Sequence, residues 1–385
     1  MTEVLLPTRD GTTQSLVFRE PAVLTTRSAR PTSRAVFAAC HVVADPRRAS
    51  IPVRSEHIDW DTTLDLRRQL WALGLGVAES MDTAQRGMGL SADDAMSLAQ
   101  RTLEADPHGG RAVVVGISTD ALDSNIATLE QIGDAYLRQL ELVESMGGTA
   151  VVMPSRHLAR VARSPRDYVA VYQRLFEASR GKLILHWLGK AFDPTLSSYW
   201  GSADIATAIE TVVELIVDHA PKVSGVKISL LDPTYELQLR IRLPRDVQVF
   251  TGDDFNYVEM IAGDGVTYSH ALLGAFAAVG RYASAAMTRL DVGDVQGFRS
   301  LLEPTLPLSR LIFEAPTQYY KVGITWLAYL TGQQAHFRML GGYESGRTIV
   351  HLADIVREAD RIGLFPDPDL TAERARTFFT TQGVR

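Results

Sequence analysis

Short apolar runs and longer segments with helical periodicity alternate along most of the chain. An apolar run bounded by turn residues is typical of a strand in a parallel sheet, which is buried on both faces. Apolar residues every three or four positions predict an amphipathic helix. The predicted strands cover residues 35–40, 75–79, 112–116, 150–154, 183–187, 223–231, 247–250 and 265–268. The predicted helices cover residues 61–73, 91–103, 125–146, 167–179 and 205–216, and a further helix follows from residue 271.

Eight strand–helix units predict an α/β fold, a (β/α)8 TIM barrel, over residues 34–290. A doubly wound open sheet also alternates strands and helices, but the chain has no glycine-rich dinucleotide turn. Residues 1–33 contain a predicted β-hairpin followed by a connection. Strand signals cease after residue 290, and the 291–385 region reads as a helical extension, with helical stretches at 301–313, 318–330 and 349–362.

The sixth predicted strand carries a lysine in the middle of an apolar run. By two-residue alternation, Lys227 shares one face with Gly225 and Ser229, while Val226 and Ile228 occupy the other. Burial lowers the pKa of a lysine, and only a neutral amine attacks a carbonyl group to form a Schiff base. The structural alternative is a lysine that extends to solvent or pairs with a carboxylate.

Polar residues follow several predicted strands, at the end of a barrel where active sites lie. His186 ends the fifth strand, and an imidazole can transfer protons near neutral pH. Glu79 ends the second strand, and Arg86 in the following loop can anchor a substrate carboxylate. Each of these residues also has a structural alternative. In that interpretation His186 is a core histidine, Glu79 is an ion-pair partner that supports the site, and Arg86 bridges subunits. The other candidate binding residues are Ser80, Lys190, Gly252, Asp253 and Tyr268.

Composition narrows the class of protein. The 385 residues are 46% hydrophobic and 22% charged, as expected for a soluble globular chain. A formal net charge of −6 argues against nucleic acid or an acidic membrane as a partner. The single cysteine, Cys40, excludes an intrachain disulfide, and no apolar run is long enough for a membrane span or a signal peptide. We therefore expect a cytoplasmic protein.

The order of these motifs resembles the dihydrodipicolinate synthase / N-acetylneuraminate lyase family of Schiff-base (β/α)8 lyases. The resemblance spans residues 34–330 and rests on four segments: Ala78-Glu79-Ser80, Gly225-Val226-Lys227, Thr251-Gly252-Asp253-Asp254 and, more loosely, Gly263-Asp264-Gly265-Val266. It implies that Lys227 is the Schiff-base lysine, that no metal or organic cofactor is needed, and that the chain forms a homo-oligomer, a dimer or a tetramer.

The chain also departs from that family pattern. The family has two hydroxyl residues before the second-strand glutamate, where this chain has Gly76 and Val77. The family's fifth-strand tyrosine is absent, and His186 stands in its place. The N-terminal hairpin and a polar stretch over 45–57 look like additions. Because a histidine can also transfer protons near neutral pH, the mechanism implied by the resemblance is retained, but the substrate need not be pyruvate.

These observations predict a carbon–carbon lyase of the aldolase type that acts on a small oxo acid or a sugar-derived oxo compound. Lys227, His186 and Glu79 are the predicted catalytic residues. One alternative is a metal-assisted barrel isomerase or hydrolase that uses His186, Asp253, Asp254 and His270. A second alternative is a non-catalytic relative that binds a metabolite.

Overall fold

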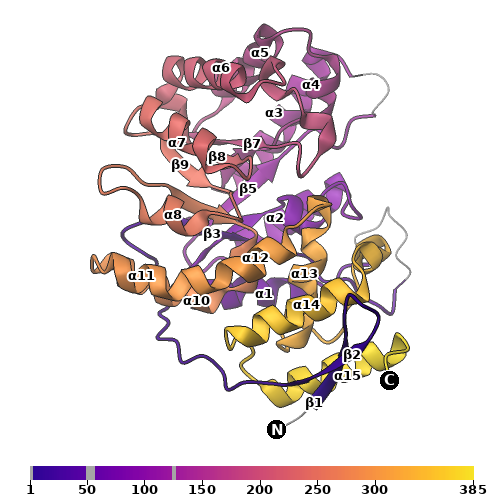
Figure 1. The fold of residues 1–385 in the computed structure, drawn as a ribbon. Helices are drawn as coiled ribbons and strands as arrows, with labels where there is room; N and C mark the ends of the chain where they lie inside the picture. Colours follow the sequence, from indigo (N-terminus) through magenta and orange to yellow (C-terminus); the bar gives the residue numbers. More distant parts are fainter. Residues whose placement is uncertain (1–2, 49–56, 124–126) are drawn as a thin grey trace.

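The computed structural model describes residues 3–48, 57–123 and 127–385, and its centre is a closed parallel barrel (Figure 1). The strand order is β10-β3-β4-β5-β6-β7-β8-β9, so each strand pairs with its neighbours in sequence and the last closes onto the first. The predicted (β/α)8 barrel is confirmed. Its strands are β3 (Val36–Ala39), β4 (Gly76–Glu79), β5 (Val113–Ile117), β6 (Thr149–Val152), β7 (Leu183–Leu188), β8 (Val223–Ser229), β9 (Gln248–Thr251) and β10 (His270–Leu273).

Side chains alternate between the barrel interior and the surrounding helices. The interior is filled by an apolar cluster that includes Phe37, Val114, Ile184, Phe250 and Leu272. The outward-facing residues pack against the helical layer. The helices of that layer are α1 (Trp60–Ala72), α2 (Ala92–Ala105), α3 (Leu129–Ser145), α4 (Arg156–Val161), α5 (Pro165–Ala178), α6 (Ile205–Asp218), α7 (Pro233–Arg242), α8 (Tyr257–Ala262), α9 (Ala275–Ala278) and α10 (Gly280–Asp291).

The last barrel strand lies further along the chain than its predicted position. Residues 265–268 form a loop, and β10 covers His270–Leu273, where the sequence pattern predicted the start of a helix. The loop is held by Asp264, whose carboxylate accepts hydrogen bonds from the backbone N–H groups of Val266 and Thr267. The prediction was wrong because a short apolar run before a helix does not reveal by its periodicity whether it is strand or helix.

The C-terminal helices lie against one side of the barrel, and the N-terminal hairpin lies against them (Figure 1). The hairpin pairs β1 (Glu3–Pro7) with β2 (Thr13–Val17), and β1 packs on α14 and α15. The helices are α11 (Val295–Leu302), α12 (Leu306–Ile312), α13 (Tyr320–Leu330), α14 (Ile349–Arg361) and α15 (Pro368–Thr381). The helical stretch predicted over 301–313 is divided around Pro304, as expected from its prolines, and α15 has no predicted counterpart. Most of the polar stretch at 45–57 and the start of the predicted 125–146 helix lie outside the described residues.

None of the helices in the described ranges combines the length and the apolar character that crossing a bilayer requires.

The carboxyl group of Glu236, on α7, is fully buried. The side chains of Ser269 and Thr251 lie close enough to act against the rise in its pKa, but neither carboxyl oxygen forms a hydrogen bond of normal geometry within the described residues. Burial, with a smaller contribution from Asp253, raises the pKa of Glu236 to about 7. The folded state therefore binds this proton more tightly than the unfolded state, whose carboxyl group has a pKa near 4.5.

We expect Glu236 to make the protein less stable as the pH rises from about 4.5 to 7, because the folded state keeps a proton that unfolding releases, and a higher pH favours that release. Glu236→Gln should remove this slope and increase the free energy of unfolding at pH 8 by roughly 2–4 kcal/mol. Urea unfolding at several pH values measures both effects. Equal slopes for the two proteins would contradict the prediction.

Candidate active site

Lys227 lies on the inner face of β8, as the alternation predicts. The register aligns it with His186 of β7 and Phe250 of β9. The residue is 7% exposed, and its Nζ atom forms no hydrogen bond or ion pair with the described residues. Burial lowers the pKa of Lys227, although the carboxyl groups of Asp254 and Asp82 act in the opposite direction. This environment favours the neutral amine that carbonyl attack requires.

Gly252 follows β9 and leaves space for the Lys227 side chain. A Cβ atom at this position would lie 2.6 Å from Lys227 Cε and 2.2 Å from Ser229 Oγ. Both contacts are shorter than carbon and oxygen atoms tolerate, so glycine is the residue that fits here. Gly252 thus contributes to the site by its lack of a side chain.

A small inner cavity of about 10 Å³ surrounds the lysine, which is room for about one water molecule. It opens at the carboxyl ends of the strands, because Ser229 ends β8, Asp254 follows β9 and Gly274 follows β10. Asp254 accepts a hydrogen bond of 2.8 Å from the backbone N–H of Ala275. Burial raises the pKa of Asp254 to about 7, so near neutral pH this carboxyl group can hold or release a proton.

Tyr320 reaches the inner cavity from α13, outside the barrel strands. Its hydroxyl lies 2.7 Å from Thr83 Oγ1, in the loop after β4. Its ring stacks on Phe313, with centroids 4.3 Å apart. Burial raises the pKa of Tyr320 well above its usual value, so the phenol keeps its proton. The neutral phenol and the Thr83 hydroxyl form a proton-donating pair beside Lys227.

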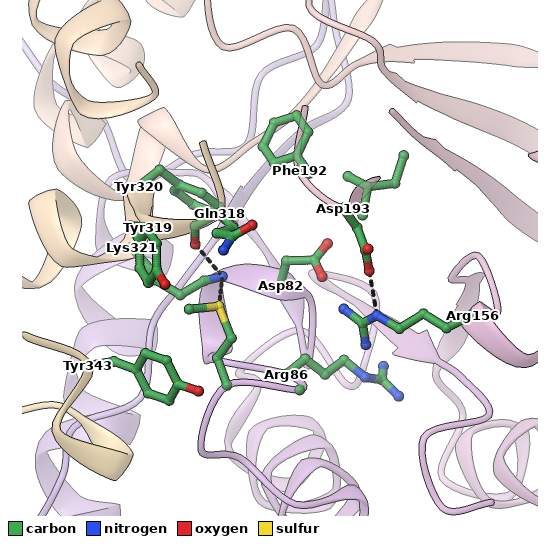
Figure 2. Close-up of a pocket in the computed structure, with 13 residues that line it drawn as sticks. Asp82, Arg86, Arg156, Phe192, Asp193, Gln318, Tyr319, Tyr320, Lys321 and Tyr343 are labelled. Atoms are coloured by element: carbon green, nitrogen blue, oxygen red, sulfur yellow. Dashed lines mark hydrogen bonds and ion pairs between the residues drawn. The ribbon is translucent and has the colours of Figure 1, made fainter. Parts of the chain in front are cut away.

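An outer cavity of about 400 Å³ leads from this point to the surface (Figure 2). The two cavities share four lining residues: Asp82, Leu188, Phe192 and Tyr320. Asp82 occupies the centre of the site, with Lys321 on one side and Arg156 on the other (Figure 2). The carboxylate of Asp82 makes no hydrogen bond or ion pair within the described part of the chain, so it is available to a ligand.

The basic residues of the outer cavity differ in how their charges are balanced. Arg156 pairs with Asp193 and lies 3.7 Å from Asp120. Lys321 is only 3% exposed, and its Nζ donates to the carbonyl oxygen of Gln318 at 3.0 Å and contacts Met88 Sδ at 3.3 Å. Burial lowers the pKa of Lys321 to about 8.

Arg86 lines the outer cavity but is fully engaged by the protein. Its guanidinium donates to the carbonyl oxygens of Ser80 and Gly116, to the Ser118 hydroxyl and to Asp120. The structure thus brings Arg86 to the site, where its hydrogen bonds hold the loop after β4 against β5.

His186 lies directly beside the inner cavity without lining it. Its Nε2 atom is 3.1 Å from Ser229 Oγ, and its Nδ1 atom contacts Met153 Sδ at 3.4 Å. Burial, reinforced by the nearby Lys227, lowers the pKa of His186 well below its usual value, so the ring is neutral. Any effect of His186 on a ligand passes through the Ser229 hydroxyl.

The structure does not bring Glu79 and Ser80 into either cavity. Glu79 faces outward from β4 and forms a buried bidentate ion pair with Arg67 of α1, at 2.8 and 3.0 Å. It also accepts a hydrogen bond from Thr102 of α2. The Ser80 hydroxyl donates to the carbonyl oxygen of Ala95. Glu79 therefore connects the barrel to two surrounding helices, which corrects its predicted place among the catalytic groups.

We expect Glu79→Gln to lower the free energy of unfolding by about 3–5 kcal/mol, because it leaves the Arg67 guanidinium buried without its counter-charge. Denaturant unfolding measures the effect. Asp65→Asn, on the same helix as Arg67, is the matched control. It removes an exposed ion pair with Arg68 and should change the free energy of unfolding by less than about 1 kcal/mol. A Glu79→Gln protein of normal stability would contradict this role.

Three further residues predicted for the site do not line either cavity. Lys190 is exposed in the loop after β7. Asp253 accepts hydrogen bonds from the N–H groups of Phe255 and Asn256, so it caps the turn after β9. Tyr268 precedes β10 at the opposite end of the barrel, where Arg34 stacks on its ring at 3.5 Å. It was assigned to the site because the last strand was placed too early.

The alternative metal site finds no cluster of ligands in the described ranges. His270 begins β10 at the far end of the barrel, where its Nδ1 accepts a hydrogen bond from the backbone N–H of Ala35. It is therefore not grouped with Asp253 and Asp254, as that alternative required.

Comparison with known proteins places the chain in a family. Residues 4–384 match the family described as "Protein of unknown function (DUF993)". The chain belongs to this family. No curated protein sequence matches the chain.

Solved structures show where the DUF993 fold recurs. Dihydrodipicolinate synthase from Aquifex aeolicus superposes with a TM-score of 0.63 at 12% identity, over 86% of this chain and 98% of that one. The Thermotoga maritima enzyme gives 0.62 at 14% identity, over 86% and 99%. The Oceanobacillus iheyensis enzyme gives 0.59 at 14% identity, over 86% and 97%. The DUF993 chain therefore has the dihydrodipicolinate synthase fold in a divergent form, as its motifs indicated.

The main site residues that the sequence patterns missed are Asp82, Thr83, Tyr320 and Lys321. Asp82 and Thr83 lie in the loop after the second predicted strand, which also contains Arg86, but nothing in their spacing singles them out. Tyr320 and Lys321 belong to a helix whose residues are otherwise mostly apolar. The signal available in the sequence was a lysine within an otherwise apolar helix, because lysine is rarely buried unless it is paired.

Proposed function

We propose that the protein is a carbon–carbon lyase of the aldolase type that forms a Schiff base on Lys227 with a small oxo compound. The observation that carries this proposal is the buried amine of Lys227, which has no hydrogen-bond or ion-pair partner in the described residues and faces a cavity with proton-donating groups. The common fold with dihydrodipicolinate synthases supports the same chemistry by analogy alone.

The proposed reaction begins with attack of the neutral Lys227 amine on the substrate carbonyl carbon. The carbonyl oxygen leaves as water after it receives protons, and a protonated imine remains. A base then removes the proton of a hydroxyl group on the second carbon from the imine carbon. The bond between that carbon and the first carbon breaks, the hydroxyl-bearing fragment leaves as an aldehyde or ketone, which is the first product, and the bond's electrons neutralise the imine as an enamine. Protonation of the enamine carbon and addition of water then release the second product and restore the amine.

The surrounding residues have distinct roles in this proposal. Tyr320, with Thr83, donates the proton that lets the carbonyl oxygen leave. The unpaired carboxylate of Asp82 is the base for the hydroxyl proton. His186 is a positioning residue that holds Ser229 beside the imine.

Borohydride trapping tests the proposal. The protein is incubated with a panel of oxo acids and sugar-derived oxo compounds, reduced, and weighed intact and as peptides. We expect an added mass equal to that of the oxo compound less one oxygen atom, on the peptide that contains Lys227. The Lys182→Met variant is the matched control, since Lys182 is exposed before β7 at the other end of the barrel, and its adduct should be unchanged. A folded protein with no adduct across the panel would favour a non-catalytic metabolite-binding protein.

The predicted homo-oligomer and the predicted cytoplasmic location stay predictions. Sedimentation of the purified protein measures the first of them.

A further inference from the structure

Each of the two connected cavities is lined by one buried lysine. The chain has only five lysines among its 39 basic residues, and two of the five, Lys227 and Lys321, line the two connected cavities. They come from different parts of the fold, one from β8 of the barrel and the other from α13. The cavities therefore hold two buried amines in different surroundings.

The inner cavity around Lys227 is acidic. Asp82 and Asp254 line it, and it contains no arginine or second lysine among its described lining residues. Its volume of about 10 Å³ accommodates a carbonyl group more readily than a carbonyl with a carboxylate attached to it. A carboxylate bonded directly to the reacting carbon would lie against Asp82 and the partly ionised Asp254, and like charges at short range repel.

The outer cavity contains Lys321, a buried cation whose neighbouring carboxylate, Asp82, lies beyond ion-pair distance. The Lys321 ammonium has three N–H donors, of which one meets a carbonyl oxygen and another only a sulfur atom, a weak acceptor. It also lies 4.9 Å from the centre of the Tyr320 ring, but none of these contacts is with an anion. No carboxylate lies within ion-pair distance of it in the described ranges, whereas Arg156 across the cavity is paired with Asp193. A buried ammonium whose contacts are only partly strong acceptors is unfavourable, so an anionic ligand group would complete its contacts.

A ligand that reaches both lysines must pass the residues that the cavities share. Asp82 and Tyr320 line both cavities, so they lie between the two amines, and Figure 2 shows Asp82 beside Lys321. Building on the proposed function, we propose that the substrate is an oxo acid whose carboxylate is separated by several bonds from its carbonyl carbon and binds Lys321, rather than an acid with adjacent carbonyl and carboxylate groups.

The test compares three probes in the same trapping reaction at pH 7. Pyruvate has adjacent carbonyl and carboxylate groups, levulinate has them separated by two methylene groups, and hexan-2-one is a neutral ketone of similar length to levulinate. We expect levulinate to give half-maximal adduct on Lys227 at a concentration about 10- to 100-fold lower than either other probe, as one charge-assisted hydrogen bond provides. Lys321→Met should remove that advantage, and Lys321→Arg should retain part of it.

Distinct results separate the possible failures. If pyruvate labels Lys227 as well as levulinate does in the wild-type protein, this inference is overturned and the Schiff-base function stands. The same conclusion follows if Lys321→Met keeps the levulinate advantage. Because the comparison of probes uses the wild-type protein, it holds even if a variant fails to fold. No adduct from any probe in the full panel, or an adduct on Lys321 in place of Lys227, overturns both proposals.

Discussion

Replacing Lys227 with methionine should abolish the reducible adduct completely while the protein stays folded. Methionine has a similar length and packs well in irregular cores, but it offers no nucleophile. The wild-type amine is desolvated without an ion pair, so its removal should not lower the urea midpoint of unfolding. A residue retained at a cost in stability is typical of a functional site. Mass spectrometry of the reduced protein and urea unfolding measure the two effects.

Lys227→Arg sharpens the interpretation of this result. It places a permanent positive charge near Asp254, but a guanidinium stays protonated and does not form the imine. Both variants should therefore lack the adduct, although only Lys227→Arg carries a charge at this position. An adduct of normal yield in Lys227→Met would locate the reactive amine elsewhere and refute the proposed role.

The barrel could be predicted from the sequence because its signals are local. Each parallel strand is buried on both faces, so it appears as an apolar run, and alternation within β8 is enough to direct Lys227 inward. The motif order then indicated the dihydrodipicolinate synthase fold. The error at β10 arose where two apolar segments lay close together and only tertiary pairing with β3 decides between them.

The composition of the site depends on contacts that are distant in sequence. Glu79 was expected to be catalytic because it ends a barrel strand, but its partner Arg67 on α1 turns it into a structural ion pair. Tyr320 meets Thr83 across 237 positions of the chain. Neither contact leaves a periodic signal in the sequence, so the residue types alone could not distinguish the outward-facing acid from the inward-facing phenol.

Removing the hydroxyl of Tyr320 should separate imine chemistry from ligand binding. In Tyr320→Phe the ring still stacks on Phe313, so the packing of α13 is preserved and only the bond to Thr83 is lost. A positioned proton donor accelerates a reaction by about 10²–10⁴-fold. We expect the variant to slow, by about this factor, the exchange of ligand C–H groups beside the carbonyl for deuterium in D2O, followed by NMR. That exchange passes through the imine and the enamine, so it reports the proposed chemistry before the natural substrate is known.

Two controls decide what a slower exchange means. Tyr329→Phe lies on the same helix, where Arg374 stacks on its ring away from the cavities, and should exchange at the wild-type rate. Thr83→Val should also slow the exchange. The variant that carries both substitutions should exchange only a little more slowly than either single variant, because the two hydroxyls act as one unit. Full activity in Tyr320→Phe would remove the phenol from the mechanism and leave Asp82 as the remaining proton-transfer group that lines both cavities.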